Sequence, residues 1–231
     1  WQSMKLMDVP LSTSHRFDVY FVSDLQQKYV LDASMTGTSV KSPKKTFQTK
    51  DLYMGFATSA DSTHAYMRAG DLDVAFQGRG YVDSLLVKLD AFTARADAQW
   101  TSKTIVQEEL KSLLPDVCLK AEAGNDNPIA NFLSMQGVSF NRLAMDIDTS
   151  PQEGINGETL ICGMHTDSLM IDSIRLDLKH GDDGLDFLTE VISNTRKNQE
   201  AFEINLDGHI GNGQAQLLLQ YLNAKKEKGV Y

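Results

Sequence analysis

The sequence lacks any long apolar run and is poor in tryptophan and in positive charge. No run approaches the roughly 18 apolar residues that a membrane-spanning helix requires, and no signal-peptide pattern opens the chain. Two tryptophans are too few for a platform on which sugars could stack. With 22 lysines and arginines against 31 aspartates and glutamates, the formal net charge is -9, which repels phosphate backbones. We therefore expect no nucleic-acid partner.

Cysteine is scarce as well. The two cysteines, Cys118 and Cys162, permit one disulfide, but the alternation of apolar and polar residues around them argues against it. Cys118 is out of phase with its apolar neighbours, whereas Cys162 is in phase with Leu160 and Met164. We expect the two thiols to be unlinked and to face opposite ways.

The length and the apolar content are those of an ordinary folded protein. A chain of 231 residues suffices for one large domain or two small ones, and 42% hydrophobic residues suffice for a core. The chain begins with Trp1 instead of methionine, so we interpret it as a piece of a longer protein whose targeting or anchoring segment lies outside it. Residues 229–231 resemble the start of a further strand.

Alternation of apolar and polar residues dominates the stretch from residue 138 to residue 221. Such a period of two is typical of half-buried strands. The alternating apolar residues of this stretch include Ile174, Leu176 and Leu178, then Phe202, Ile204 and Leu206, then Leu217, Leu219 and Tyr221. Gly-Asn-Gly at residues 211–213 predicts a tight hairpin between the last two runs. A change of phase between Ile171 and Ile174 predicts a bulge or a short turn near residues 172–173.

The first third of the chain repeats this pattern, and its middle does not. Alternation predicts strands over residues 15–22, 29–35, 52–56, 65–67 and 72–77, with a further short strand within residues 1–10. Apolar residues at spacings of three and four then predict an amphipathic helix over residues 82–100. A second helix is expected over residues 104–114, opened by a capping box of Thr104 and Gln107. A strand follows over residues 116–123. A third, short helix is expected between Asn127 as N-cap and Gly137 as C-cap.

These patterns predict a mainly β protein, a curved antiparallel meander with an inserted pair of helices and one further short helix. Residues 1–80 would form a first sheet segment, residues 81–137 a mostly helical insertion with one strand, and residues 138–231 a second segment continuing the same sheet. A meander of this kind usually buries one face and leaves the other in water. We expect the helices to cover one end or one face of the sheet.

No catalytic constellation is evident in the sequence. The five histidines (His15, His64, His165, His180, His209) are dispersed, and none lies at helical spacing from another, so no metal-binding helix is offered. His165, Asp167 and Ser168 lack the geometry of a hydrolase triad, because neighbours in a strand point apart, and no nucleophile elbow exists. Residues 182–184 are better interpreted as a turn than as part of a calcium loop. We predict no enzyme activity, no metal and no cofactor.

Several segments resemble one known family. They are Leu114-Pro-Asp116, residues 124–128 (Gly-Asn-Asp-Asn-Pro), residues 146–157, residues 202–208 (Phe-Glu-Ile-Asn-Leu-Asp-Gly) and residues 217–221. In this order they resemble the middle region of TamB-like translocation and assembly module proteins of Bacteroides-type bacteria, within the AsmA-like group. The likeness covers roughly residues 9–231 and rests on loose motifs without a catalytic signature.

The resemblance implies a role in building the cell envelope. It implies an inner-membrane anchor outside this chain and a periplasmic location for this segment, as a long curved sheet called a β-taco. Its apolar groove would conduct phospholipid towards the outer membrane and support outer-membrane protein assembly, in partnership with an Omp85-type assembly protein bound by regions outside this chain. The helical insertion at residues 82–114 bears on how continuous such a groove is.

A lipid groove and a sealed core remain alternatives at this point. The candidate groove residues are Ile174, Leu176, Leu178, Phe202, Ile204, Leu206, Leu217, Leu219 and Tyr221. An apolar trough could hold an acyl chain without specific polar contacts, since each buried CH₂ is worth about 0.8 kcal/mol. The same face could instead be a core covered by the three helices, in a closed interaction module that recruits partners through its sheet edges. Unpaired backbone groups at those edges also predict edge-to-edge pairing between copies.

Overall fold

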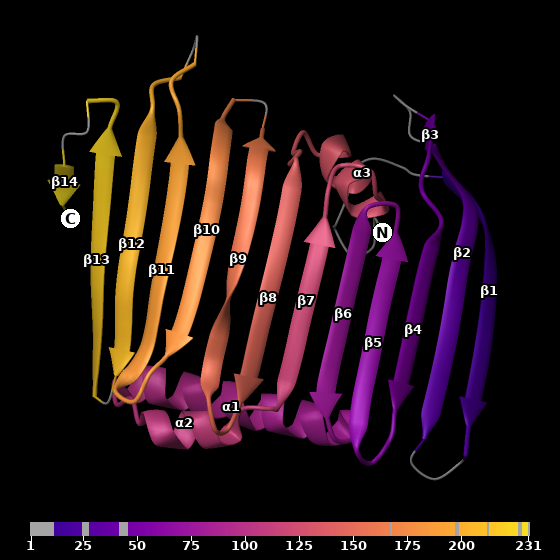
Figure 1. Ribbon diagram of the computed structural model, residues 1–231, viewed down its shortest axis with the longest axis horizontal. Helices are drawn as coiled ribbons and strands as arrows, with labels where there is room; N and C mark the ends of the chain where they lie inside the picture. Colours follow the sequence, from indigo (N-terminus) through magenta and orange to yellow (C-terminus); the bar gives the residue numbers. More distant parts are fainter. Residues whose placement is uncertain are drawn as a thin grey trace.

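One open, curved antiparallel sheet forms the body of the protein in the computed structural model (Figure 1). The structure describes residues 12–24, 28–41, 46–166, 168–196, 199–211, 213–225 and 228–230. Within them, the predicted fold class is confirmed: twelve antiparallel meander strands and three helices. Two three-residue strands bring the sheet to fourteen strands. The short strand expected within residues 1–10 lies outside the described residues.

The elements follow the predicted order. The first part of the chain holds β1 (Ser12–Ser23), β2 (Tyr29–Lys41), β3 (Thr46–Gln48), β4 (Leu52–Thr58), β5 (Ser62–Ala69) and β6 (Leu72–Arg79). The middle holds α1 (Val82–Ser102), α2 (Gln107–Leu113), β7 (Val117–Ala123) and α3 (Pro128–Met135). The last part holds β8 (Arg142–Ser150), β9 (Gly154–His165), β10 (Met170–His180), β11 (Gly184–Ser193), β12 (Phe202–Gly211), β13 (Gln214–Asn223) and β14 (Lys228–Val230).

Each strand pairs with its neighbours in the chain, except that β2 pairs with β4 and the short β3 pairs with β2 alone. The strand β7 joins the two predicted sheet segments, because it pairs with β6 on one side and with β8 on the other. The sheet therefore runs without a break through the region predicted to be a helical insertion.

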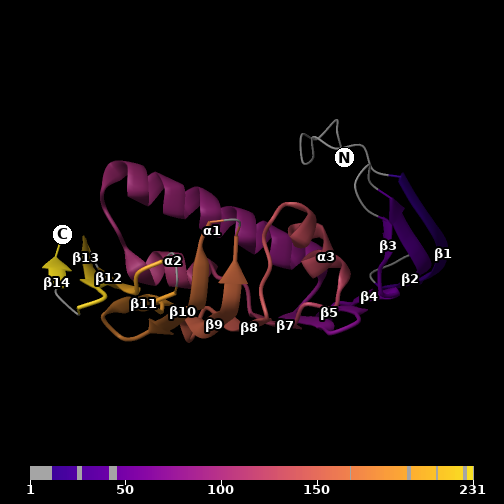
Figure 2. The ribbon, with the colours of Figure 1, turned by 90° about the horizontal axis from the view of Figure 1, so that it is seen from above.

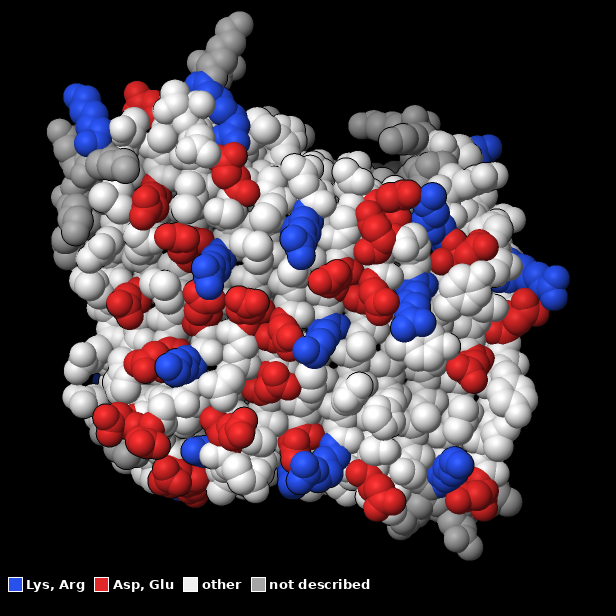
Figure 3. All heavy atoms as spheres, in the orientation of Figure 1, with Lys and Arg blue, Asp and Glu red and all other residues white. Residues whose placement is uncertain are grey.

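The register of the strands sorts the side chains into two faces. Directly opposed residues of paired strands share a face, and successive residues of a strand alternate. We call the face that carries Leu119, Ala121 and Ala123 of β7 the apolar face, and the face that carries Cys118 and Lys120 the polar face. Acidic and basic side chains of both signs are spread over the side of the sheet turned away from the helices (Figure 3), which is the polar face.

We number three of the lines of opposed residues that cross the apolar face, beginning with the one nearest α1 and α2 among the three. Row 1 consists of Phe21, Leu31, Phe56, Ala65, Phe76, Leu119, Ile147, Gly157, Leu178, Phe187, Gly208 and Leu217. Row 2 consists of Val19, Ala33, Met54, Met67, Val74, Ala121, Met145, Thr159, Leu176, Thr189, Leu206 and Leu219. Row 3 consists of Ala123, Leu143, Ile161, Ile174, Val191, Ile204 and Tyr221.

The helices α1 and α2 lie on the concave side of the sheet and run along one end of its strands (Figures 1 and 2). At the start of α1, Leu85 is buried and lies over Gly78 of β6. At the far end of the pair, the carbonyl of Ile105 accepts a hydrogen bond of 2.8 Å from the backbone N–H of Gly213, beside the β12–β13 hairpin. The two helices therefore form a bar that is fastened to the sheet near both of its ends.

The helix α3 lies at the opposite end of the strands (Figure 1) and covers a small core. That core consists of Ala69, Leu72, Ala123, Ala130 and Phe140, with row 3 residues Leu143 and Ile161 packed against it. The prediction of Asn127 as N-cap is confirmed, since its side chain accepts a hydrogen bond from the N–H of Ala130. The helix ends at Met135 with Gln136 as C-cap, one residue before the expected Gly137.

Two local predictions were wrong. The expected capping box of Thr104 and Gln107 does not form, because α2 begins after Val106 and has no side-chain cap. No bulge displaces the β9–β10 pairing near residues 172–173, since the register of Ile171 with Met164 equals that of the residues beyond.

The cysteines are free, as predicted, but the expected reason was wrong. Ile161 packs towards the core, so its neighbour Cys162 lies on the polar face, where Cys118 also lies. The two thiols stay apart because they lie two strands apart and in different lines of opposed residues.

Candidate functional site

The nine groove residues predicted from the sequence lie together on the apolar face. The strand β10 contributes Ile174, Leu176 and Leu178, β12 contributes Phe202, Ile204 and Leu206, and β13 contributes Leu217, Leu219 and Tyr221. Row 1, row 2 and row 3 each contain residues from this set. Alternation within single strands was enough to choose them, because a strand with an unbroken period of two has only two faces.

The apolar face is only partly covered by the protein itself. None of the nine residues is buried, and three of them are exposed: Leu217 by 64%, Leu219 by 39% and Tyr221 by 41%. Among the described residues, the buried hydrophobic side chains are Ala33, Ala69, Leu72, Leu85, Leu114, Ala123, Ala130 and Phe140. Most of these lie beneath or within the helical parts at the two ends of the strands. Helical parts therefore stand at both ends of the strands, and the apolar face between them is open to solvent. We call this open part of the apolar face the trough.

The floor of the trough offers almost no polar group. Thr159 and Thr189 are the only side chains with a polar atom in rows 1 and 2, and no charged residue belongs to either row. The ring of Phe187 lies flat over Gly208, its opposed residue in row 1, since a Cβ on that glycine would lie only 2.2 Å from the ring. The ring of Phe187 therefore keeps the floor apolar at Gly208, where bare backbone would otherwise face the trough.

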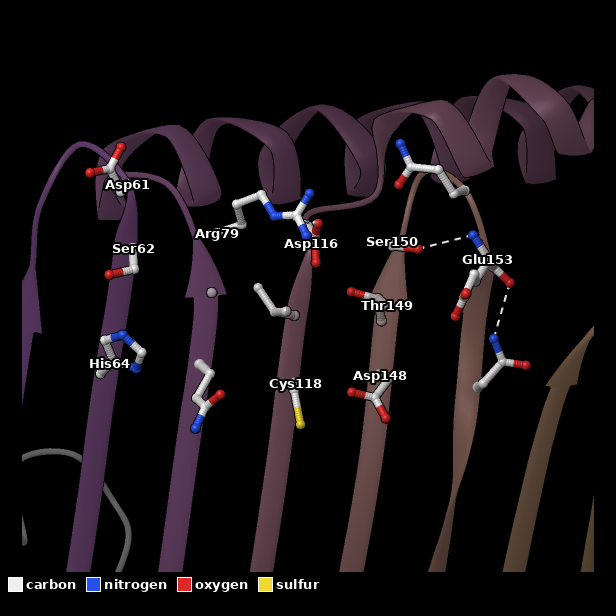
Figure 4. A pocket seen from close by; sticks show the side chains of 16 residues that line it. Asp61, Ser62, His64, Arg79, Asp116, Cys118, Asp148, Thr149, Ser150 and Glu153 are labelled. Carbon is white, nitrogen blue, oxygen red and sulfur yellow. Dashed lines mark hydrogen bonds and ion pairs between the residues drawn. The ribbon is translucent and has the colours of Figure 1, made fainter.

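A second candidate site is a polar hollow of about 780 Å³ on the other face of the sheet. Its side chains come from β5 to β9 and from the turns beside the helices (Figure 4). Arg79 and Asp116 form an ion pair of 3.2 Å at its rim, and the hydroxyl of Ser150 accepts a hydrogen bond from the N–H of Glu153. Its lining carries more carboxylates than cationic groups, so it suits a positively charged or neutral ligand better than an anion.

The thiol in this hollow is poorly suited to catalysis. Burial raises the pKa of Cys118, and the neighbouring Asp148 carboxylate raises it further, whereas a nucleophilic cysteine needs a lowered pKa. His64 lies in the same line of residues but with β6 and its Gln77 in between. Two strand spacings amount to about 10 Å, which is beyond hydrogen-bonding reach. Cys118 therefore lacks the features of an activated nucleophile.

Three residues of the polar face have the spacing of a metal site. One ligand atom each from Cys118, Asp146 and Asp148 lie within 4.8 Å of one another. Sequence patterns did not indicate this cluster, because it depends on the pairing of β7 with β8. Lys120 already neutralises Asp146 across 2.7 Å, and the raised thiol pKa opposes the thiolate that a metal requires. We assign no metal to this cluster.

Comparison with known proteins finds no match to this chain. Neither a family model, nor a curated protein, nor a solved structure matches the chain. Within the described residues, the structure contains no helix with the length and apolar character needed to cross a membrane.

Chemically, the two candidate sites differ in kind. The polar hollow presents an ion pair, further carboxylates and a thiol with a raised pKa, which are groups that can bind a polar ligand. The trough presents a long apolar surface partly open to solvent, and a contiguous exposed apolar surface marks a place where a protein binds something apolar. The trough is the stronger candidate for function.

Proposed function

We propose that the trough holds the acyl chains of phospholipid and lets them move along the sheet. The observation that carries this proposal is the course of rows 1 and 2, which pass through all twelve long strands without a charged residue. At a strand spacing of about 4.8 Å, twelve strands span about 53 Å, well over the roughly 30 Å of a bilayer's hydrocarbon core. A trough of that length is longer than a single lipid molecule needs for binding.

The energetics suit transport better than tight binding. Each CH₂ group that leaves water is stabilised by about 0.8 kcal/mol, so a chain of ordinary length is held firmly by apolar contact alone. Because rows 1 and 2 have few polar atoms, no position along them is strongly preferred over the next. A bound chain can therefore shift along the rows without breaking a specific contact. The helices α1 and α2 run along one side of the rows, and α3 lies on the other side near the middle strands (Figure 1).

The wider role rests on the family resemblance. In this proposal the chain is the middle segment of a TamB-like envelope protein in the periplasm, anchored in the inner membrane through regions outside it. The segment would carry phospholipid towards the outer membrane and support outer-membrane protein assembly together with an Omp85-type partner. No catalysis is required of it, and no cofactor.

Photocrosslinking tests the trough directly. A photoreactive residue in place of Leu206 or Leu219, which oppose each other in row 2, should form adducts with phospholipid in cells. The matched control is Leu218, which lies on the same strand and is 42% exposed but belongs to the polar face. Adducts at Leu206 and Leu219 but not at Leu218 are expected. Absence of lipid at all three positions, together with lipid-free protein in native mass spectrometry, would rule the proposal out.

A closed interaction module is the second candidate, favoured by the exposed edge strand β1. The double variant Leu206→Asp, Leu219→Asp separates the two functions. If the trough binds lipid, the variant should fold, because both side chains are accessible, and should lose bound lipid. If the apolar face is instead the structural core of a closed module, the variant should fail to fold. Leu218→Asp is the control for an added charge on the same strand.

A further inference from the structure

The trough is not equally wide along the sheet. On β10 and β13, every residue of rows 1, 2 and 3 is at least partly exposed. An acyl chain that lies over these strands can therefore contact any of the three rows. On β5 and β6 the exposure is different, because the start of α1 and the core beneath α3 both reach these two strands.

The start of α1 covers the line of residues on one side of row 1. On β5 and β6 this line holds Thr63 and Gly78, which oppose each other and are both buried. The side chain of Leu85 lies over Gly78, and the hydroxyl of Thr63 donates a hydrogen bond of 2.8 Å to the carbonyl of Gly80, just before the helix. The start of α1 is therefore held against these two strands.

The core beneath α3 covers the other side of row 1. Its residues Ala69 and Leu72 oppose each other beyond row 2 and are only 2% and 4% exposed. The row 2 residues of these strands, Met67 and Val74, pack against the same core. Row 1 is therefore the line left between the two helical parts.

Row 1 carries a small side chain at this point. Ala65 of β5 opposes Phe76 of β6, and both are partly exposed. Ala65 is the only small residue in row 1 from β1 to β8, where the row consists of Phe21, Leu31, Phe56, Ala65, Phe76, Leu119 and Ile147. Its methyl group leaves space above β5 that a larger side chain would fill.

We propose that β5 and β6 form a neck of the trough, through which acyl chains pass along row 1 alone, over Ala65 and past Phe76. This inference rests on the proposed function and adds to it a position that limits the movement of lipid. Residues on one face of a strand repeat about every 7 Å, so row 1 alone offers the width of one side chain. The two acyl chains of a phospholipid therefore pass the neck one after the other, whereas they can lie side by side over β10 to β13.

A larger side chain at residue 65 tests the neck. Ala65→Phe should block movement along row 1 and leave the fold intact, because residue 65 faces the trough and is partly exposed. Photoreactive residues in place of Leu31 or Leu219, which lie on opposite sides of the neck and are 36% and 39% exposed, detect lipid on each side. In the full-length protein in cells, the wild-type neck should give lipid adducts at both positions. Ala65→Phe should keep them at one position and reduce them at the other to the level found at Leu218.

Control variants separate a blocked path from other effects of the substitution. Thr189→Phe adds the same ring in row 2 of β11, between the neck and Leu219, and should keep both adducts because rows 1 and 3 remain open there. Ala65→Ser adds a polar atom but little volume and should also keep both. Circular dichroism and melting temperature check the fold of each variant. If Ala65→Phe does not fold, Ala65→Val decides, with a smaller loss expected on the same side.

The possible outcomes distinguish the neck from the function on which it rests. Lipid at both positions in Ala65→Phe would overturn the neck and leave the proposed function standing. Loss at both positions in that variant, or an equal loss in Thr189→Phe, would also overturn the neck, because the added ring would then act on binding and not on passage. A wild type without lipid at either position would overturn the proposed function itself, and the neck with it.

Discussion

The side-chain amide of Asn127 donates a hydrogen bond of 2.7 Å to the carboxylate of Asp71. The other carboxylate oxygen accepts a hydrogen bond from the N–H of Asp126, and Asn127 also donates to the carbonyl of Gly124. Asn127 is fully buried and its oxygen caps α3, so this one contact connects the β5–β6 turn to the helix that walls one end of the trough.

Asp71→Asn should therefore loosen α3 at neutral pH. Burial raises the pKa of Asp71, but the hydrogen bonds from Asn127 and from the backbone lower it more, so its pKa lies below the ordinary value of 3.8. A lowered pKa stabilises the fold above the pKa of the unfolded state, and this stabilisation is lost as the pH falls through the folded-state pKa. We expect the variant to lose up to about 1 kcal/mol of unfolding free energy at pH 7, because Asp71 is exposed and solvent screens its charge, and to approach the wild type in acid.

Chemical denaturation at several pH values, with hydrogen exchange of residues 128–135, measures this effect. Asp73→Asn is the control, because Asp73 makes only an exposed ion pair with Arg68, and it should change stability by no more than about 0.5 kcal/mol. Equal losses for Asp71→Asn at pH 7 and in acid would show that the charge of Asp71 plays no part.

Thr58 of β4 caps the start of α1 from outside the helix. Its hydroxyl accepts a hydrogen bond of 3.0 Å from the N–H of Val82 and contacts the hydroxyl of Thr63 at 2.8 Å, which in turn donates to the carbonyl of Gly80. Thr58 and Thr63 are both buried, and the N-cap residue Tyr81 offers no side-chain cap of its own. These hydroxyls therefore fix the point where the chain leaves the sheet for the helical bar.

We predict that Thr58→Val costs about 1–3 kcal/mol of stability, because it keeps the shape of the side chain and leaves buried polar groups unpaired. Thermal unfolding measures the loss of stability. Faster hydrogen exchange in the first turn of α1 would show that the loss arises there. Thr93→Val is the matched control, since the hydroxyl of Thr93 is exposed and bonds only to carbonyls of its own helix. A loss of equal size at Thr93 would contradict the role given to Thr58.

Gln99 holds the two helices of the bar together. It is only 3% exposed, its oxygen accepts a hydrogen bond of 2.8 Å from the N–H of Val106, and its nitrogen donates to Glu109. Glu109 also pairs with Arg95. This interhelical network replaces the capping box that the sequence predicted for α2.

Gln99→Met should unfasten α2, since it removes these hydrogen bonds at nearly constant volume. We expect a loss of about 1–3 kcal/mol and faster hydrogen exchange in residues 107–113. Gln216→Met, at an exposed position of β13, is the control for the same change of side chain. If exchange in α2 stays at the wild-type rate, the network does not hold the bar.

Sequence patterns predict which side chains face the trough, but not the contacts that hold the helices beside it. Alternation placed Leu176, Leu206 and Leu219 correctly, because a side-chain period of two depends on the strand alone. Cys162 was misplaced because its neighbours Leu160 and Met164 are apolar, although they lie on the wetter face. Only cross-strand register decides such cases. The walls depend on contacts between residues far apart in the chain, such as Ile105 with Gly213, which leave no periodic signal.

The ring of Phe187 and the bare backbone of Gly208 support a last prediction. A Cβ at residue 208 would lie 2.2 Å from the ring, so Gly208→Ala forces Phe187 off the floor and into the trough. Overpacking of this kind costs about 1–3 kcal/mol, and the displaced ring should also reduce bound lipid. Adding Phe187→Leu to Gly208→Ala should restore part of both losses, because the smaller side chain leaves room for the methyl group. A double-mutant cycle over unfolding free energies measures the coupling, which should exceed about 0.5 kcal/mol between opposed residues. Strict additivity would show that ring and glycine do not depend on each other.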